Sequence, residues 1–472
     1  MVNRGQPSKD CFPCRKRKLR CDLREEGCGQ CQRAELLCHG FRDPNELAFR
    51  DETNATKQKV LARQALTHLA KPTALPLGWT VRSRNAFFSI YVTGLSRSCD
   101  ALVPLYARAS ALDNLPASID AVSLAFMSFL LNSPELMYLA NKQYVIAIHG
   151  LSQALHSPHM SASDETLQSV LLLDLYEKLA NHDPRSPTSW MSHIQGAMSL
   201  VKARGHSNFY HGIACKLASR VAITLTISCG AATCPVPDEL MSLRRGLDCF
   251  IIDAKWCFTA LLVDAVNLRA DVHNGRFACA ADAAGRAKEI QDRLYSLETT
   301  LPPSWNPRRL SLAKSHPHVF GHYYDVYPNH FVTQVWNAIR IMRLEMNDIL
   351  QRHSLSHISN AETSTSKTIS DISRQICAAV PQFILPEARP ENALPFSPLQ
   401  MLQCCTLLSP LYLAAQLSTD NHMRDWIHHI MQHMVEAGNM KIARDVADIL
   451  RTRPDIDYWT VYAMTGSYAL AA

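Results

Sequence analysis

The organisation of this chain is decided by the stretch CFPCRKRKLRCDLREEGCGQCQRAELLC at residues 11–38. Its cysteines follow the spacing C-x2-C-x6-C-x6-C-x2-C-x6-C, and they are Cys11, Cys14, Cys21, Cys28, Cys31 and Cys38. Moving the first three along the chain by seventeen positions gives the last three. The segment is therefore a C-x2-C-x6-C unit that is repeated once.

The number of cysteines predicts a cluster that holds two metal ions. A zinc ion with sulfur ligands takes four of them in a tetrahedron, and each unit has only three. Two ions need eight ligand positions, which six cysteines fill if two of them bridge both ions. The repeat makes a pair of equivalent residues the simplest bridge, and we expect that pair to be Cys11 and Cys28. The expected cofactor is therefore two Zn²⁺ per chain.

The same stretch concentrates positive charge in one place. Between the second and third cysteines, cations fill five of six positions: Arg15, Lys16, Arg17, Lys18 and Arg20. Residues 1–41 contain nine Lys or Arg against five Asp or Glu, and six thiolates with two Zn²⁺ add about −2. We expect these cations on one short helix. Most charge runs are solvated surfaces, but a run on a metal-fixed scaffold favours a surface that follows DNA phosphates.

The motif Cys-x2-Cys-Arg-x-Arg-Lys-x2-Cys-Asp, followed by three more cysteines at these gaps, resembles the fungal Zn2Cys6 binuclear-cluster transcription factors. The resemblance implies that Lys18 and its neighbours lie in the DNA major groove and read a short G/C-rich, CGG-like triplet. It also implies that Arg15, Lys16, Arg17 and Arg20 mainly contact the backbone. Both roles are chemically reasonable, because lysine donates to guanine O6 and N7, and zinc modules present a helix to the groove.

The cysteine cluster has an alternative interpretation as a structural zinc knot that stabilises a protein-binding module without touching DNA. The position of the basic run between the second and third ligands favours DNA, because a groove reader needs its cations there. The loop at residues 22–27 lacks the proline that this family often carries before the fourth cysteine. Gly27 can make the turn there through its free φ.

Composition indicates a folded protein with more than one unit. The chain has 472 residues, of which 47% are hydrophobic and 19% charged, so two or three folding units are expected and general disorder is excluded. The net charge is +6, and residues 1–41 supply +4 of it. The rest of the chain is near neutral and is a poor candidate for a second nucleic-acid surface.

Several features favour the nucleus as the location. Residues 1–7 have no apolar segment of the kind found in signal peptides. The ten cysteines outside the cluster stand in apolar surroundings and are predicted to be buried thiols of a reducing compartment. The best apolar run, residues 121–134, is too short for a membrane span and predicts a buried core helix, so no membrane partner is expected. The basic run at residues 15–20 fits a nuclear import signal.

The expected fold is mostly α. Residues 1–41 should form the Zn2Cys6 DNA-binding domain, residues 42–78 a linker, and residues 79–460 an all-helical regulatory domain. The linker contains a candidate helix at residues 54–70, whose apolar seam is too short to identify a coiled coil. The sequence therefore leaves open whether the chain forms a homodimer.

Helical periodicity dominates after residue 78, and convincing alternating strands are absent. Inward-facing stripes are predicted at Phe87, Tyr91 and Leu95; at Leu167, Val170, Leu171 and Leu175; at Trp190, Ile194, Ala197 and Val201; and at Trp336, Ile339, Leu344 and Met346. Residues 163–165 and Ser189 are predicted helix starts, and Gly205 a helix stop. Residues 353–370, rich in Ser and Thr, should form a mobile loop, and prolines bracket another at residues 386–398.

Short segments after residue 80 resemble the all-helical fungal-specific regulatory domain. They are residues 190–197 with Arg204 and Gly205, then residues 376–381, then residues 410–414. Helix packing accounts for most of their features, and Gly196 with Ala197 suits the close approach of a neighbouring helix. The resemblance implies a domain that regulates activity, with transcriptional co-regulators as partners.

No sequence feature supports catalysis. His429 and His433 share a helical face, but no glutamate follows His429, so the metalloprotease motif is missing and a solvated polar face is expected. Asp445 and Asp448 are interpreted as surface charge. The predicted function is a nuclear, sequence-specific transcription factor for RNA polymerase II genes. The alternative is a helical small-molecule receptor or enzyme with an accessory structural zinc module.

Overall fold

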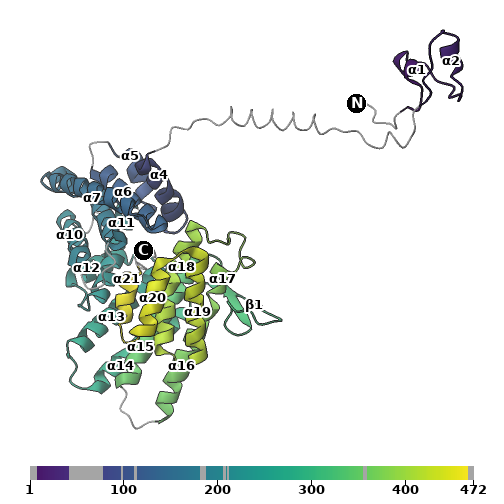
Figure 1. Cartoon of the computed structure of the whole chain (residues 1–472). Coiled ribbons are helices and arrows are strands. Elements are labelled where there is room, and N and C mark those ends of the chain that lie inside the picture. Colours follow the sequence, from purple (N-terminus) through teal and green to yellow (C-terminus); the bar gives the residue numbers. More distant parts are fainter. Residues whose placement is uncertain are drawn as a thin grey trace. The chain divides into compact units, whose positions relative to one another are not determined.

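The computed structural model describes residues 8–41, 78–96, 99–110, 114–180, 188–205, 209, 212–353 and 359–465. For residues 188–190 and 359–363 it describes the backbone but not the side chains. The chain divides into two compact units, Met1–Leu77 and Gly78–Ala472 (Figure 1). The candidate linker helix at residues 54–70 lies outside the described residues. The domain boundaries at residues 41, 78 and 460 stay a prediction.

The described part of the first unit contains two short helices, α1 (Phe12–Lys16) and α2 (Gly29–Gln32). After the C-cap of each helix the chain takes a left-handed conformation, with φ of +53° at Lys18 and +51° at Glu35. Lys18 and Glu35 are seventeen positions apart, as are the equivalent cysteines of the two repeated units. The repeat that is visible in the cysteine spacing therefore extends to the backbone.

The second unit is almost entirely helical in its described residues, which confirms the predicted mostly-α class. Its first helices are α4 (Trp79–Ala86), the π-helix η2 (Phe87–Thr93), α5 (Leu102–Arg108), α6 (Asn114–Leu131), α7 (Pro134–Leu155), α8 (Pro158–Ser161), α9 (Asp164–Ala180), α10 (Thr188–Arg204) and α11 (Gly212–Ala231). Then follow α12 (Asp238–Leu247), α13 (Ala254–His273), α14 (Ala280–Thr299), the 3-10 turn η5 (Pro303–Trp305) and the strands β1 (Arg308–Ser311) and β2 (Tyr323–Val326). The last are α15 (His330–His353), α16 (Ser359–Ala378), α17 (Pro381–Ile384), α18 (Pro398–Leu417), α19 (Asn421–Gly438), α20 (Lys441–Thr452) and α21 (Tyr458–Met464).

Helix α6 shows why this unit needs many helices. Its sequence is apolar on nearly every side, so it has to be surrounded, and it packs against α4, α7 and α9. Two helices, α6 and α11, are long and apolar enough to cross a membrane by length and composition alone. Most of each is buried among the other helices, so this is weak evidence for a membrane. Residues 121–131 of the predicted core helix lie in α6.

Several predicted helix ends are found close to where the sequence places them. The Ser163 hydroxyl accepts from the Thr166 amide at 3.1 Å and caps α9. Helix α10 stops at Gly205, whose φ is +79°. The start of α10 differs, because the helix begins at Thr188 and Ser189 lies inside it. In the same helix Ile194, Ala197 and Val201 are fully buried, as the predicted stripe requires.

Two expectations about irregular segments were wrong. A two-stranded antiparallel sheet pairs Arg308 with Val326 and Ser311 with Tyr323. The sequence hides it because β1 is four residues long and has mostly exposed side chains. Residues 359–370 are not a loop but the first part of α16. The apolar stripe that continues at Ile369, Ile372 and Ile376 is buried and anchors this helix against the core.

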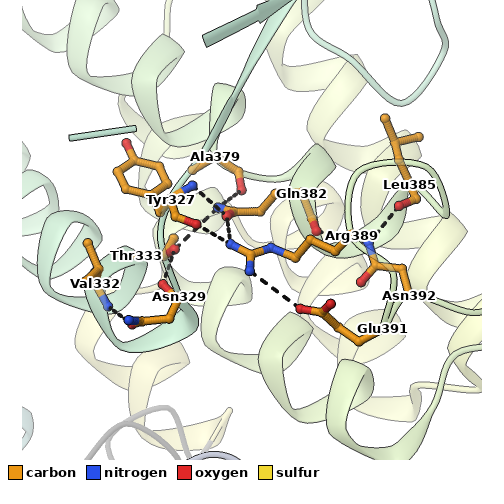
Figure 2. Close-up of polar contacts among 10 residues, drawn as sticks. All are labelled: Tyr327, Asn329, Val332, Thr333, Ala379, Gln382, Leu385, Arg389, Glu391 and Asn392. Atoms are coloured by element: carbon orange, nitrogen blue, oxygen red, sulfur yellow. Dashed lines mark hydrogen bonds and ion pairs between the residues drawn. The ribbon is translucent and has the colours of Figure 1, made fainter. Parts of the chain in front are cut away.

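The proline-bracketed loop after α17 is held by a buried polar network (Figure 2). The Gln382 side chain accepts from the Tyr327 amide at 3.1 Å and from Arg389 Nη2 at 2.7 Å. Arg389 also donates to the Tyr327 carbonyl at 2.5 Å, and Asn392 donates to the Leu385 carbonyl at 2.7 Å. A buried amide at residue 382 therefore joins β2, α17 and the loop, which fixes a segment that prolines alone would leave irregular.

The cysteines outside the metal-binding stretch do not all follow the prediction. Cys99, Cys229, Cys377, Cys404 and Cys405 are buried, and Cys215 and Cys234 are partly buried. The prediction of burial was wrong for three, since Cys249, Cys257 and Cys279 are exposed. All sixteen cysteines are free thiols in the structure.

Glycines mark where helices of this unit come closest, but not where the sequence suggested. Gly196 is exposed, and a Cβ there would meet no heavy atom within 4 Å, so the predicted close approach at Gly196 is wrong. At Gly230 in α11 a Cβ would lie 2.5 Å from Cη2 of Trp459. Trp459 is buried and its Nε1 donates to Glu345 Oε1 at 2.9 Å. The absence of a side chain at residue 230 therefore lets α21 dock on α11.

These two glycines give a matched pair of substitutions. We expect Gly230→Ala to reduce the free energy of unfolding by about 1–3 kcal/mol, because the added methyl group would overlap the Trp459 ring and force it to shift. Gly196→Ala should increase it by about 0.5–1 kcal/mol, because alanine favours a helix and the site is open. Thermal unfolding followed by circular dichroism would measure both. A Gly230→Ala protein that melts at or above the wild-type temperature would contradict the tight docking of α21.

Candidate metal centre and nucleic-acid surface

The six predicted cysteines come together in the first unit. Two groups of four sulfur atoms are present: Cys11, Cys14, Cys21 and Cys28, and Cys11, Cys28, Cys31 and Cys38. Within each group every sulfur lies within 4.8 Å of the others, and the groups share Cys11 and Cys28. All of these side chains are buried except Cys38, which is partly exposed.

The sulfur separations fit zinc and do not fit disulfides. The Sγ atoms of Cys11 and Cys28 are 3.6 Å apart, and the same distance separates Cys11 from Cys31 and Cys14 from Cys28. A disulfide would need about 2.05 Å. A tetrahedron with Zn–S bonds of about 2.3 Å has edges of about 3.8 Å. The thiols are therefore placed as the corners of metal tetrahedra.

Local backbone geometry positions the cysteines. Cys11 precedes α1 and Cys14 lies in its first turn, so one helical turn brings the two sulfurs to the same side. The turn after α1 is closed by the Leu19 amide, which donates to the Cys14 carbonyl at 2.9 Å. The turn after α2 is closed in the same way, by the Leu36 amide and the Cys31 carbonyl at 3.0 Å. Each is a Schellman turn, which ends the helix and redirects the chain toward the next cysteine.

Asp22 joins the two halves of the module. Its carboxylate oxygens accept from the Gly29 amide at 3.1 and 3.0 Å, at the N-terminus of α2. Arg24 contacts the same carboxylate at 3.2 Å. A Cβ at residue 29 would lie 3.0 Å from Asp22 Oδ2, so glycine allows this approach. The sequence analysis missed this role, although Asp22 directly follows the third cysteine.

The thiols need a positive partner. Burial raises the pKa of Cys11 well above its ordinary value and raises the pKa of Cys31 to about 12. Burial acts in the same direction on Cys28, but hydrogen bonds with Cys31 lower its pKa to about 6. Without a cation, Cys11 and Cys31 would therefore keep their protons at neutral pH. Bound Zn²⁺ supplies the charge that stabilises the thiolates.

The five predicted DNA-contacting cations do not lie on one helix, and this expectation was wrong. Only Arg15 and Lys16 belong to α1; Arg17 is its C-cap, and Lys18 takes the left-handed position of the Schellman turn. Arg20 follows this turn, one residue before Cys21. Apart from the partly buried Arg15, these side chains are exposed. Together they form a basic surface, here called the α1 basic turn, on the first half of the module.

The second half of the module does not repeat this charge. The positions seventeen residues after the cations hold Gln32, Arg33, Ala34, Glu35 and Leu37. Only Arg33 is basic, and the position equivalent to Lys18 holds the acidic Glu35. The metal scaffold is thus pseudo-symmetric, whereas the charge is concentrated on one side of it.

No second metal site accompanies the cysteines in the part of the chain that the structure describes. The ring centroids of His429 and His433 lie 5.5 and 3.9 Å from that of His318. Among the described residues, these histidines do not belong to a group of three or more side chains placed to hold a metal ion. Burial and the neighbouring imidazoles lower the pKa of His318 to about 4. Asp448 pairs with Arg451 at 3.3 Å on the surface, as the sequence analysis expected.

The buried sulfur groups and their spacing define a binuclear zinc-cluster protein. Comparison with known proteins agrees: residues 9–47 match the fungal Zn(2)-Cys(6) binuclear cluster domain, and residues 84–451 match the fungal specific transcription factor domain. The chain belongs to this family of fungal transcription factors. These are not enzyme families, and membership implies DNA as a partner and the nucleus as the location.

Similarity to individual proteins is limited. An uncharacterized protein of Emericella nidulans, AN5342, is 31% identical over 88 residues. The match covers 19% of this chain and 18% of that protein, so the chain spans less than a fifth of its relative. No solved structure matches the chain.

The geometry predicts how cysteine substitutions change the zinc content of the full chain. The wild-type protein should contain two zinc ions. Cys28→Ser should lose both, because this sulfur belongs to both groups, whereas Cys38→Ser should keep about one, since it belongs to a single group. Elemental analysis after desalting measures the ratio. Cys249→Ser, an exposed cysteine of the helical unit, is the matched control and should keep two ions.

Equal zinc contents in Cys28→Ser and Cys38→Ser would contradict the shared position of Cys28. A wild-type ratio other than two zinc ions per chain would contradict the binuclear cluster itself. Circular dichroism of each variant would establish whether the helical unit remains folded, so that loss of zinc can be assigned to the cluster.

Proposed function

We propose that this protein is a nuclear, sequence-specific regulator of RNA polymerase II genes that reads a CGG-like DNA triplet with residues 1–41. Residues 79–460 regulate its activity, and residues 42–78 connect the two. The observation that carries the proposal is the position of Lys18. It is exposed, it occupies the tight turn after α1, and that turn is closed on the carbonyl of Cys14, a zinc ligand.

Each part of the module has a role in this proposal. Cys11 and Cys28, which belong to both sulfur groups, would be shared by the two Zn²⁺, and Cys14, Cys21, Cys31 and Cys38 would supply the remaining thiolates. The metal fixes the two short helices, which bury too little apolar surface to fold alone. Asp22 keeps the halves in register through the Gly29 amide.

The α1 basic turn divides into base contact and phosphate contact. A lysine ammonium can donate to guanine O6 and N7 in the major groove, and Lys18 is exposed in the left-handed turn after α1. Arg15, Lys16, Arg17 and Arg20 surround it on the same half and are suited to phosphates on either side. Phosphate contacts position the module, and Lys18 supplies the sequence preference.

The proposed partners are double-stranded DNA and transcriptional co-regulators. A homodimer would suit the linker segment at residues 54–70, but this segment lies outside the described residues. The alternative of an enzyme with an accessory zinc module is not retained, because both matched domains are those of transcription factors.

The test is DNA binding by the full chain and its variants. We expect Lys18→Ala to weaken binding to a duplex with one CGG triplet by about 1–3 kcal/mol, and binding to a scrambled duplex much less, because it removes a base contact. Arg17→Ala should weaken binding to both duplexes alike, because it removes a phosphate contact. It should also reduce by about 1 the slope of the logarithm of the binding constant against the logarithm of the salt concentration. Fluorescence anisotropy at several salt concentrations measures these effects.

Arg33→Ala is the matched control, because Arg33 is the exposed cation that corresponds to Lys16 in the second half. It should change neither the affinity nor the preference for CGG appreciably. If the wild-type chain, loaded with zinc, binds the CGG and scrambled duplexes equally at moderate salt, the proposed base reading is incorrect.

A further inference from the structure

The helical unit contains an apolar cavity of about 90 Å³ that opens to the surface. Four helices line it: α11, α13, α15 and α21. Its walls include the side chains of Phe258, Phe331, Trp459 and Tyr462. A cavity needs about 10–15 Å³ of such space to hold one water molecule, so this one admits several waters or the apolar part of a small organic molecule.

Two polar side chains face this apolar space without protein partners. Lys255 of α13 lines the cavity, and in the described part of the chain its amine makes neither a hydrogen bond nor a salt bridge. Its neighbour is the Phe331 ring, whose centroid is 5.7 Å from Nζ. Gln334 of α15 also lines the cavity, and its Nε2 is buried without a hydrogen-bond partner. Buried donors are normally paired, so Gln334 Nε2 lacks an acceptor, whereas the partly exposed Lys255 places an unpaired charge at the cavity wall.

The local charge favours an anion as that acceptor. Burial lowers the pKa of Lys255, and the nearby Arg220 cation acts in the same direction. The carboxylate of Asp253 acts against it but is partly committed elsewhere, because it caps α13 by accepting from the Trp256 amide at 2.8 Å. Among the residues that line the cavity, Lys255 is the only one with an ionisable amine or carboxylate, so a cation but no carboxylate belongs to its wall. A bound anion would give this amine a counter-ion.

We propose that this cavity binds a small monocarboxylate with a short apolar tail. The carboxylate pairs with the Lys255 ammonium and accepts from Gln334 Nε2. The tail lies against Phe258 and Trp459. A neutral or cationic head group would leave Lys255 without a counter-ion.

Such a ligand would act on the last helix of the unit. Helix α21 supplies one wall through Trp459 and is tied down at its start, where Arg269 contacts Asp457 at 2.8 Å and Glu345 at 3.3 Å. Glu345 in turn accepts from Trp459. A ligand that contacts α13, α15 and α21 together would stabilise this docking. That such a ligand regulates the protein rests on the proposed regulatory function of the helical unit, whereas the binding of the ligand to the cavity does not.

The test uses the full-length, zinc-loaded chain with benzoate and isovalerate as probes, and with benzamide, isovaleramide and benzylamine as matched controls of head-group charge. We expect at least one of the two acids to raise the melting temperature and to give a saturable calorimetric isotherm. The corresponding amide should bind at least tenfold more weakly, and benzylamine should not bind.

Three variants locate the site. Lys255→Met keeps the length of the side chain and removes its charge, so it should weaken acid binding at least tenfold and abolish the preference over the amide. Ala338→Leu adds a side chain to the cavity wall and should also weaken binding. Lys288→Met removes an exposed lysine of α14 that pairs with Asp292, and it should bind the acids like the wild type.

The proposal is overturned if neither acid binds the wild-type chain, if the amides bind as tightly as the acids, or if Lys255→Met binds like the wild type. Binding of the CGG duplex is measured on the same preparations. A chain that binds DNA but no acid would refute the cavity proposal alone. A chain that binds an acid but does not distinguish CGG would refute the DNA proposal alone.

Discussion

The interaction on which the functional end of this protein depends is the sharing of buried sulfur between two metal positions. In the described part of the first unit, the buried apolar cluster consists of cysteines and nothing else. Burial also holds the pKa of Cys11 and Cys31 high, so the cluster resists becoming a set of bare thiolates. Zinc therefore stands in for a hydrophobic core. The helical unit is the opposite case, because its extensive apolar core needs no metal.

The features that the sequence predicted correctly are those with a strict period or a strict count. Six cysteines at a seventeen-residue offset predict the gathering of the sulfurs, since coordination number leaves few arrangements. The stripes around Leu171 and Ile339 predict helices, because a 3.6-residue period has one structural meaning. The match to the fungal transcription factor domain over residues 84–451 supports the same helical expectation.

The features that the sequence did not predict depend on tertiary contacts between a helix or turn and residues elsewhere in the fold. The left-handed turn at Lys18 needs the Cys14 carbonyl in place, so the basic run was misinterpreted as one helix. The Ser and Thr residues of α16 favour loops locally, but a buried apolar stripe overrides them. Gly196 and Gly230 look alike in sequence, and only the approach of Trp459 separates their roles. The cavity at Lys255 is assembled from four distant helices, which no short motif records.

The opposite charges on the two left-handed residues give the zinc module a polarity. Lys18 and Glu35 occupy corresponding places in a scaffold that is otherwise close to two-fold symmetric. A polyanion is attracted to one of these turns and repelled by the other. An approach that exchanged the two halves would bring Glu35 against phosphate. A metal frame with a repeated backbone therefore presents two chemically different faces, and the exchange of Lys18 for Glu35 is the sharpest difference between them.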